Sequence, residues 1–137
     1  SVMTFSSSVD KNFIGWELKR YASSKSVIGG ASKLLKYFED KFKPYRLLSY
    51  ADFSFSDGSL YKTLGFEFER MTQPGYCYID KNYSNKFDRS LFTKKRIKKL
   101  FELKDDFEFK EKDFMFEQGY DLIWNCGHFR FVKNYWR

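Results

Sequence analysis

The sequence predicts an α/β protein in which a mixed central sheet contains a strand–helix–strand unit flanked by helices. Apolar residues alternate with polar ones over 13–21, recur at helical spacing over 31–43, and form a compact run over 46–51. Because two strands joined by a crossover helix pair in parallel, this order predicts a βαβ unit. A chain of 137 residues is long enough to bury a core of its own.

The first half of the chain is expected to supply the sheet and its crossover helix. Residues 2–7 and 13–21 alternate as strands do, and a small polar stretch that ends in two glycines follows them. Ala31, Leu34, Leu35, Phe38 and Phe42 form one apolar stripe, and Pro44 ends this helix.

The second half predicts further elements of both kinds. We expect a short helix closed by a glycine, two antiparallel strands across a Pro-Gly turn, two helices and a closing hairpin. In that order these elements cover 59–64 with Gly65, 66–71, 76–79, 90–101, 111–118, and 120–125 with 128–133 around Cys126-Gly127. We therefore predict one domain over 1–137, with a core in 1–80 and a C-terminal extension in 81–137. Ser1 in place of Met leads us to expect a longer parent chain.

The net charge of +7 and a pI near 9.3 favour an anionic partner, either nucleic acid or an anionic cofactor. The basic residues gather most clearly on one predicted helix, where Lys94, Lys95, Lys98 and Lys99 would contact phosphates. An ordinary solvated helix face would have the same pattern. The acidic residues that follow it in the sequence would also neutralise it locally.

Cys77, Cys126 and His128 show no metal-binding spacing, so we expect no metal site. Two unpaired cysteines fit a reducing compartment and predict a cytoplasmic location. No apolar run reaches the length that spans a membrane, and no membrane partner is expected.

Gly29 and Gly30 stand directly before the predicted helix. The first N–H groups of a helix lack acceptors, and the helix dipole is positive there. Glycines let these groups approach phosphate oxygens without a Cβ in the way. A plain tight turn has the same sequence, so the spacing alone does not decide between a turn and an anion site.

Two motifs, taken together, resemble the GCN5-related N-acetyltransferase (GNAT) family. Ser26-Val27-Ile28-Gly29-Gly30-Ala31 matches the family's phosphate turn, with Ser26 where the family has Gln or Arg, and Tyr61, Gly65 and Phe66 match its second signature. This likeness covers about residues 13–80. A closer likeness is to GNAT-like domains of phage proteins, through "GGASKL" at 29–34, "SYADFSFSDGSLYKTLGF" at 49–66 and "GYDLIWNCG" at 119–127.

The resemblance implies the residues of a site. The backbone N–H groups of Val27, Ile28, Gly29, Gly30 and Ala31 would hold the pyrophosphate of acetyl-CoA or another acyl-CoA. Tyr61 would protonate the leaving thiolate, and Glu17, or else Asp52, would be the base for the amine. The residues taken alone have other readings: Tyr61 packs its ring on the helix that begins at Gly29, Glu17 is a solvent-facing strand residue, and Asp52 forms a turn.

The resemblance leaves two functions open. One is an acyl-CoA-dependent N-acyltransferase-like phage domain that acts on nucleic acid or a nucleic-acid-linked amine, with DNA modification as one use. The other is a non-catalytic DNA-binding or interaction module attached to a phage (homing) endonuclease. Either function would place the protein in the host cytoplasm, with an upstream domain of the full-length protein as a further partner.

Overall fold

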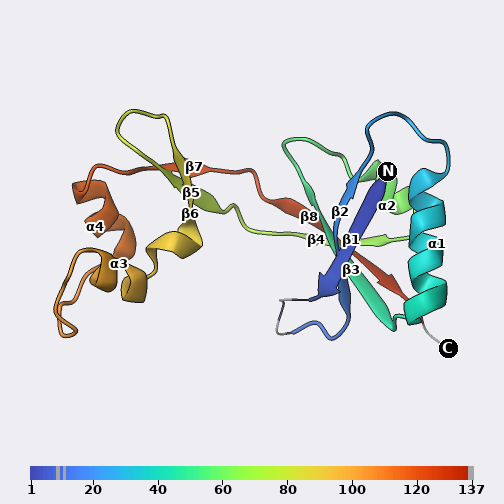
Figure 1. Ribbon diagram of the computed structural model, residues 1–137, viewed down its shortest axis with the longest axis horizontal. Helices are drawn as coiled ribbons and strands as arrows, with labels where there is room; N and C mark the ends of the chain where they lie inside the picture. Colours follow the sequence, from blue (N-terminus) through green and yellow to red (C-terminus); the bar gives the residue numbers. More distant parts are fainter. Residues whose placement is uncertain (9, 11, 136–137) are drawn as a thin grey trace. The chain divides into compact units, whose positions relative to one another are not determined.

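The computed structural model describes residues 1–8, 10 and 12–135, and the chain forms two compact units (Figure 1). Unit 1 comprises 1–73 and 126–137, and unit 2 comprises 74–125. The boundary expected after residue 80 falls inside unit 2. Unit 2 is therefore an insertion in the chain of unit 1, and unit 1 contains both ends of the sequence.

Unit 1 is built on a five-stranded mixed sheet, which confirms the predicted α/β class. Its strands, in spatial order, are β1 (Val2–Ser7), β2 (Trp16–Ala22), β3 (Arg46–Asp52), β8 (His128–Asn134) and β4 (Glu67–Met71). Strands β2 and β3 pair in parallel, and all the other neighbours are antiparallel. The predicted βαβ unit is thus confirmed, with α1 (Gly30–Phe42) as its crossover helix.

Helices α1 and α2 (Ser59–Thr63) cover one face of this sheet. Leu35 and Phe38 of α1 pack in one buried cluster with Leu18, Leu47 and Phe131 of the strands. The Phe38 ring also stacks on Phe5 with centroids 3.6 Å apart. This cluster supplies the main apolar burial of unit 1 and fixes the start of α1 against the sheet.

The opposite face of the sheet is covered by the connection between β1 and β2. Phe13 of this connection packs with Leu48 and Val132 in a second buried cluster. Since Leu47 and Leu48 are adjacent in β3, their side chains point to opposite faces. The sheet of unit 1 therefore buries apolar residues on both sides.

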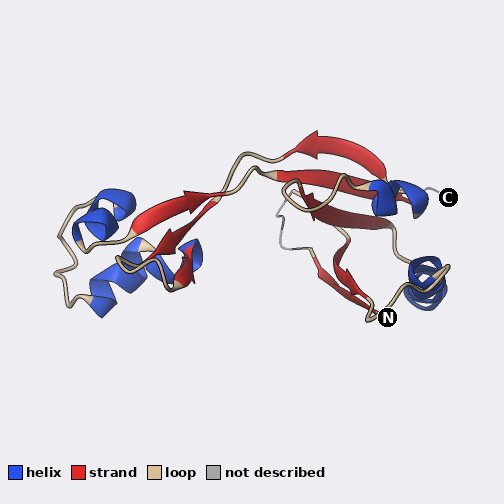
Figure 2. Ribbon diagram, turned by 90° about the horizontal axis from the view of Figure 1, so that it is seen from above, coloured by secondary structure: helices blue, strands red, loops and turns tan. Residues whose placement is uncertain are grey.

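Unit 2 has a core of its own beneath a three-stranded antiparallel sheet, which Figure 2 shows with its helices. Tyr78, Phe92, Ile97 and Met115 form its buried cluster. The elements of unit 2 are β5 (Tyr76–Ile79), β6 (Lys86–Asp88), the 3-10 helix η1 (Arg89–Phe92), α3 (Lys94–Leu100), α4 (Glu111–Glu117) and β7 (Asp121–Trp124).

Three expectations for this region are wrong. Strand β5 pairs with β6 and β7 rather than with β4, and the expected closing hairpin is absent, because β7 pairs with β5 while β8 pairs with β3 and β4. Alternation fits a strand to any partner, so the sequence pattern could not select the distant ones. The helix expected over 90–101 is interrupted at Thr93, whose backbone is extended.

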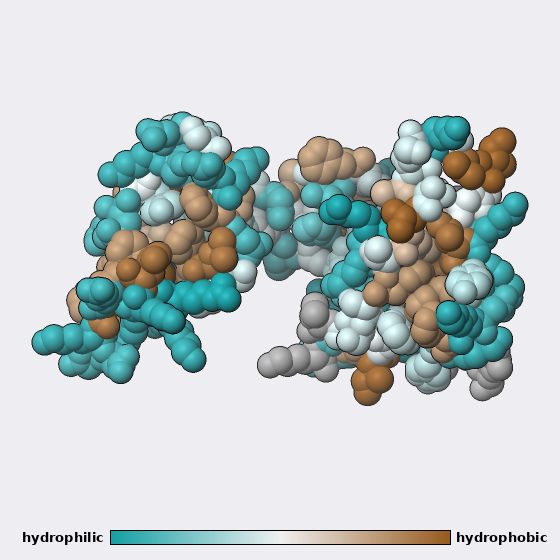
Figure 3. All heavy atoms as spheres, viewed as in Figure 1, coloured by the Kyte–Doolittle hydropathy of each residue, from teal (hydrophilic) through white to brown (hydrophobic). Residues whose placement is uncertain are grey.

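The most exposed large apolar side chains of unit 1 are Ile14, Ile28 and Phe55, from three different connections. Figure 3 shows apolar and hydrophilic side chains interspersed on both units, and single exposed apolar side chains are ordinary. Within the described residues, every helix falls short of the length and apolarity that crossing a bilayer requires.

Candidate binding site at the start of helix α1

The two glycines form a tight turn that opens directly into α1. Gly29 is the N-cap and has φ 68°, the left-handed conformation that glycine adopts without strain. The Gly30 N–H donates to the Val27 carbonyl at 3.1 Å, and the Lys33 N–H donates to the Gly29 carbonyl at 3.0 Å. The chain therefore reverses over four residues and begins the helix with its amides facing outward.

The start of α1 carries unneutralised positive charge. No acidic side chain lies in its first turn, and no side chain caps it. The N–H groups of Ala31 and Ser32 form no hydrogen bond within the described part of the chain. A Cβ added at Gly29 would meet no atom within 4 Å, so the turn is open to solvent above this residue. Free amides at a helix N-terminus are a natural anion site.

A cavity of about 600 Å³ lies against this turn. One wall is the turn with the first residues of α1, and the other is the end of α2. Lys25 is the one cationic side chain among its lining residues. These are Tyr21, Ser23, Lys25, Ser26, Val27, Gly29, Gly30, Ala31, Ser32, Leu60, Thr63 and Leu64. Four of the five predicted cofactor-binding residues line the cavity, and the fifth, Ile28, does not; its side chain is 98% exposed.

Strands β2 and β3 separate beside the cavity. Their pairing covers only Trp16–Leu47, Glu17–Leu48 and Leu18–Ser49, although both strands continue for several residues. The Ser49 hydroxyl donates to the Leu18 carbonyl at 2.8 Å where the pairing ends. Tyr21, on the end of β2 that pairs with β1 but no longer with β3, contributes to the cavity lining. The sheet thus opens at the carboxyl ends of its two parallel strands.

Tyr61 lies on α2 and packs against the main core of unit 1. Its ring stacks on Phe131 with centroids 5.2 Å apart, and its hydroxyl donates to the Tyr50 carbonyl at 3.3 Å. The ring thus packs in the core, with its stacking partner on β8, whereas the sequence reading placed it on the helix that begins at Gly29. The hydroxyl also points to the part of β3 that no longer pairs with β2, as a role at the strand opening requires.

Glu17 is buried, and its reading as a solvent-facing residue is wrong. Its side chain is 7% exposed, and Oε1 lies 2.7 Å from Nζ of Lys19. Its other oxygen, Oε2, is buried and has no hydrogen-bond partner among the described residues. Since Glu17 pairs with Leu48, it lies on the sheet face opposite to Tyr61.

Asp52 ends β3, away from Glu17. Oδ1 accepts a hydrogen bond from the Ser54 N–H at 2.8 Å, so the turn-forming role read from the sequence is present. Oδ2 lies 4.0 Å from Nε2 of His128, the cross-strand partner of Asp52. The structure does not gather Asp52 and Glu17 into one catalytic pair, since three residues of β3 lie between Asp52 and Leu48, the partner of Glu17.

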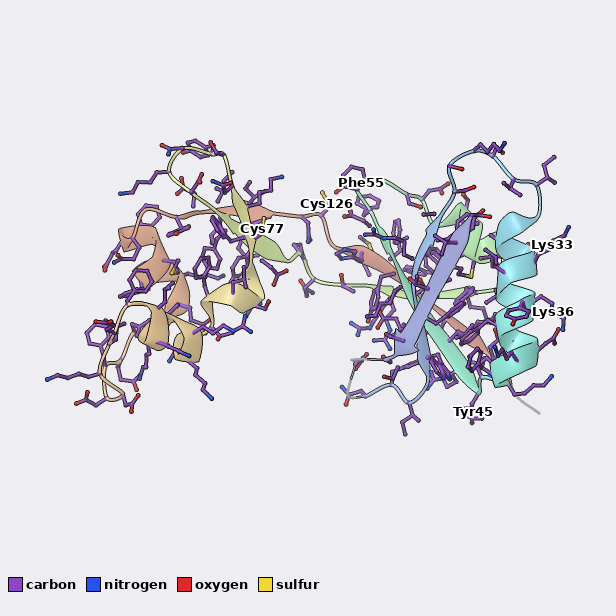
Figure 4. The ribbon with its side chains drawn as sticks, in the orientation of Figure 1. Lys33, Lys36, Tyr45, Phe55, Cys77 and Cys126 are labelled. Atoms are coloured by element: carbon purple, nitrogen blue, oxygen red, sulfur yellow. The ribbon has the colours of Figure 1, made fainter. Side chains whose placement is uncertain are left out.

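The lysine cluster lies on α3 in unit 2 and is partly neutralised. Nζ of Lys94 lies 3.9 Å from Glu108, and Lys98 donates to the Asp105 carbonyl. Lys95 and Lys99 form no ion pair within the described residues. Unit 2 contains 11 Lys and Arg against 10 Asp and Glu, so most of the excess positive charge lies in unit 1. Figure 4 shows Lys33 and Lys36 of that unit projecting from α1.

The sequence interpretation missed a buried ion network beside Glu17. Nη1 of Arg130 donates to Asp10 at 2.6 Å, and Nε lies 2.7 Å from Oε2 of Glu69 without the geometry of a directional hydrogen bond. Burial raises the pKa of the neighbouring Tyr50 hydroxyl, and the Arg130 charge opposes that shift. The available signal was the position of Arg130 between Phe129 and Phe131 on an alternating strand. The arginine points away from the two phenylalanines, so a strand that is covered on both faces has to bury it.

Cys77 and Cys126 are both free thiols (Figure 4), and the described residues contain no cluster of three or more His, Cys, Asp or Glu side chains arranged to hold a metal ion. No family model, curated protein or solved structure shows a significant match to this chain.

Proposed function

We propose that unit 1 is a GNAT-like domain that binds an acyl-coenzyme A and transfers the acyl group to an amine. The observation that carries this proposal is the cavity between the free first turn of α1 and the end of α2, next to the strand opening. The free amides suit a pyrophosphate, and Lys25 adds one positive charge to the same cavity. A cavity of about 600 Å³ accommodates part of such a cofactor.

The chain order supports the same family. Strand β2, the glycine turn, α1, β3, α2 and β4 follow one another as the resemblance requires. The separation of β2 from β3 gives the pantetheine arm and the thioester a place between the strands. Ser26 stands at the position where the family has Gln or Arg, and Lys25, which lines the cavity, supplies a cation beside it.

In the transfer step, one residue on each face of the sheet of unit 1 moves a proton. The amine nitrogen attacks the thioester carbonyl, the C–N bond forms, and the C–S bond breaks with release of the thiolate. Glu17 takes the proton that the amine loses, and Tyr61 gives its hydroxyl proton to the sulfur. These residues lie on opposite faces of the sheet, so in the proposal the thioester occupies the gap between β2 and β3.

Binding is tested with Ser32→Asp, which adds a carboxylate to the first turn of α1. The side chain of Ser32 is exposed and Ser32 lines the cavity. A carboxylate there interacts favourably with the helix dipole by ~0.3–1 kcal/mol, yet it repels a phosphate. We expect the unliganded variant to melt no lower than the wild type, while the rise in melting temperature caused by acetyl-CoA becomes smaller.

The matched control is Ser7→Asp, an exposed serine on β1 that does not line the cavity. It should keep the full response to acetyl-CoA. Saturating ligand at about 100 times its dissociation constant adds ~2.7 kcal/mol to stability. If millimolar acyl-CoA leaves the melting temperature of the wild type unchanged, unit 1 has no acyl-CoA site and the proposal is wrong.

Catalysis is tested separately by following thiol release from acetyl-CoA with primary amines, including an amine-bearing oligonucleotide. Tyr61→Phe and Glu17→Gln should each reduce turnover by roughly 100-fold or more, in the range of general acid–base catalysis, with acetyl-CoA binding retained. Binding without turnover on any amine would limit the proposal to a cofactor-binding domain.

A second candidate function is sequence-independent contact with duplex DNA through α3. Lys95 and Lys99 favour it, because they are exposed and have no carboxylate partner within the described residues. Each phosphate contact contributes about −0.9 to the slope of log affinity against log salt. The Lys95/Lys98/Lys99 to Ala triple variant should therefore have a slope that is less steep by ~2 or more. An unchanged slope would show that the lysines of α3 do not contact the DNA.

A further inference from the structure

A cluster of two aromatic and two cationic side chains lies at one end of the sheet in unit 2, and we call it the Trp124 cluster (Tyr76, Arg89, Lys112 and Trp124). Tyr76 of β5 and Trp124 of β7 are direct cross-strand partners. Their ring centroids lie 5.0 Å apart at an interplanar angle of 55°. The proposed acyl transfer uses none of these residues.

Two cations from two helical segments converge on these rings. Nζ of Lys112, at the start of α4, lies 4.6 Å from the Tyr76 ring centroid and 4.8 Å from that of Trp124. The guanidinium of Arg89 lies 5.0 Å from the Tyr76 centroid. Both cations are exposed, and neither forms an ion pair with a carboxylate among the described residues. The Tyr76 ring therefore has two exposed positive charges within about 5 Å of its centroid.

The indole of Trp124 remains available to a ligand. Trp124 is 53% exposed although it contacts both Tyr76 and Lys112. An exposed aromatic face stacks on any unpaired nucleobase, and adjacent lysine and arginine side chains bind the phosphates on either side of it. The Trp124 cluster combines an exposed aromatic face and adjacent cations within one cross-strand pair and its neighbours.

We propose that the Trp124 cluster binds single-stranded nucleic acid, with a base stacked on Trp124 and phosphates held by Arg89 and Lys112. A ligand with a quaternary or methylated ammonium does not fit, because the positive charges of Lys112 and Arg89 beside the rings repel it. A duplex does not fit either, because its bases are stacked within the helix and present no free face. The near-balance of charges in unit 2 predicts binding through local contacts with a shallow salt dependence.

The test is a fluorescence anisotropy titration of the full chain with a labelled oligothymidylate, with an oligouridylate in a second arm to separate DNA from RNA. Trp124→Ala should weaken binding by roughly 5- to 150-fold, which corresponds to ~1–3 kcal/mol for one stacked base. Trp124→Phe keeps an aromatic face and should recover most of the affinity. Thermal melting of each variant verifies that unit 2 remains folded.

Two matched controls come from the same unit. Phe116→Ala removes an exposed aromatic ring from α4, outside the cluster, and should bind like the wild type. The Arg89→Ala/Lys112→Ala variant should make the salt slope less steep by ~1.4, at about 0.7 per phosphate of a single strand, whereas Lys95→Ala/Lys99→Ala should not change it. Wild-type affinity in Trp124→Ala, equal weakening by Phe116→Ala, or equally effective competition by a duplex would each overturn the proposal.

Discussion

The hydroxyl of Ser49 donates a hydrogen bond to the carbonyl of Leu18 at the last paired position between β2 and β3. Both residues are buried, with Ser49 at 0% and Leu18 at 2% exposure. Ser49 thus adds a buried side-chain hydrogen bond between β2 and β3 at the position beyond which the two strands no longer pair.

Ser49→Ala should therefore destabilise unit 1 by ~0.5–1.5 kcal/mol, the net contribution of one intramolecular hydrogen bond. Urea denaturation measures this change, and Ser6→Ala is the control because its hydroxyl bonds only to the neighbouring Ser7 carbonyl at an exposed site. A loss below a few tenths of a kcal/mol would show that the Leu18 carbonyl finds another partner.

Two glycines with the same backbone conformation should respond differently to alanine. Gly29 and Gly58 are left-handed N-caps of α1 and α2, with φ 68° and 76°. A Cβ at Gly29 meets open space, whereas one at Gly58 would lie 2.2 Å from Cζ of the buried Phe131 ring. Gly29→Ala should cost ~1–2 kcal/mol from backbone strain alone, and Gly58→Ala clearly more. Equal losses in chemical denaturation would contradict the predicted clash.

Acid should weaken the link between the β1–β2 connection and β8. The Asn12 N–H, at 2.9 Å, and then the Arg130 guanidinium hold the pKa of Asp10 below its usual 3.8. A lowered folded-state pKa gives stabilisation that is complete above the unfolded value and is lost as the pH falls through the folded value. The stability difference between the wild type and Asp10→Asn should therefore shrink below pH 3.8. Urea midpoints at a series of acidic pH values test this, and a constant difference would contradict it.

A substitution in the core of one unit should destabilise that unit and leave the other unit unaffected. Met115 is 0% exposed at the centre of unit 2, and Leu47 is 0% exposed at the centre of unit 1. Replacing either by alanine removes ~2–5 kcal/mol of packing. In amide hydrogen exchange, Met115→Ala should raise rates in 74–125, and Leu47→Ala should raise them in the rest of the chain. Equal acceleration in both units from either variant would show that they unfold together.

The sequence predicted those parts of the fold that depend on local patterns. The stripe of α1, its termination before Pro44 and the run over 46–51 are local, so the βαβ unit was correctly expected. The partners of β5, β7 and β8 are not local. Strand β8 pairs with β3, whose residues are about 80 positions earlier in the chain, and no short-range pattern encodes that choice.

The candidate site was predictable to a similar extent. The glycine turn and Tyr61 could be located because motifs mark them. The burial of Glu17 could not, because a single carboxylate on an alternating strand reads as solvent-facing until the β1–β2 connection covers that face. The Trp124 cluster depends on cross-strand register and on the start of α4, and alternation within β7 does not reveal either.

The chain leaves unit 1 after β4 and returns just before β8, its neighbour in the sheet, where the Thr72 N–H donates to the His128 carbonyl at 2.8 Å. In the sequence, unit 2 is thus one continuous segment between two strands that pair with each other. Such a segment can be lost, gained or exchanged while every strand in the sheet of unit 1 keeps its partners. Each halving of the connection would also reduce its closure cost by about 0.6 kcal/mol. The architecture therefore allows unit 1 and unit 2 to change independently during evolution, each under its own selection.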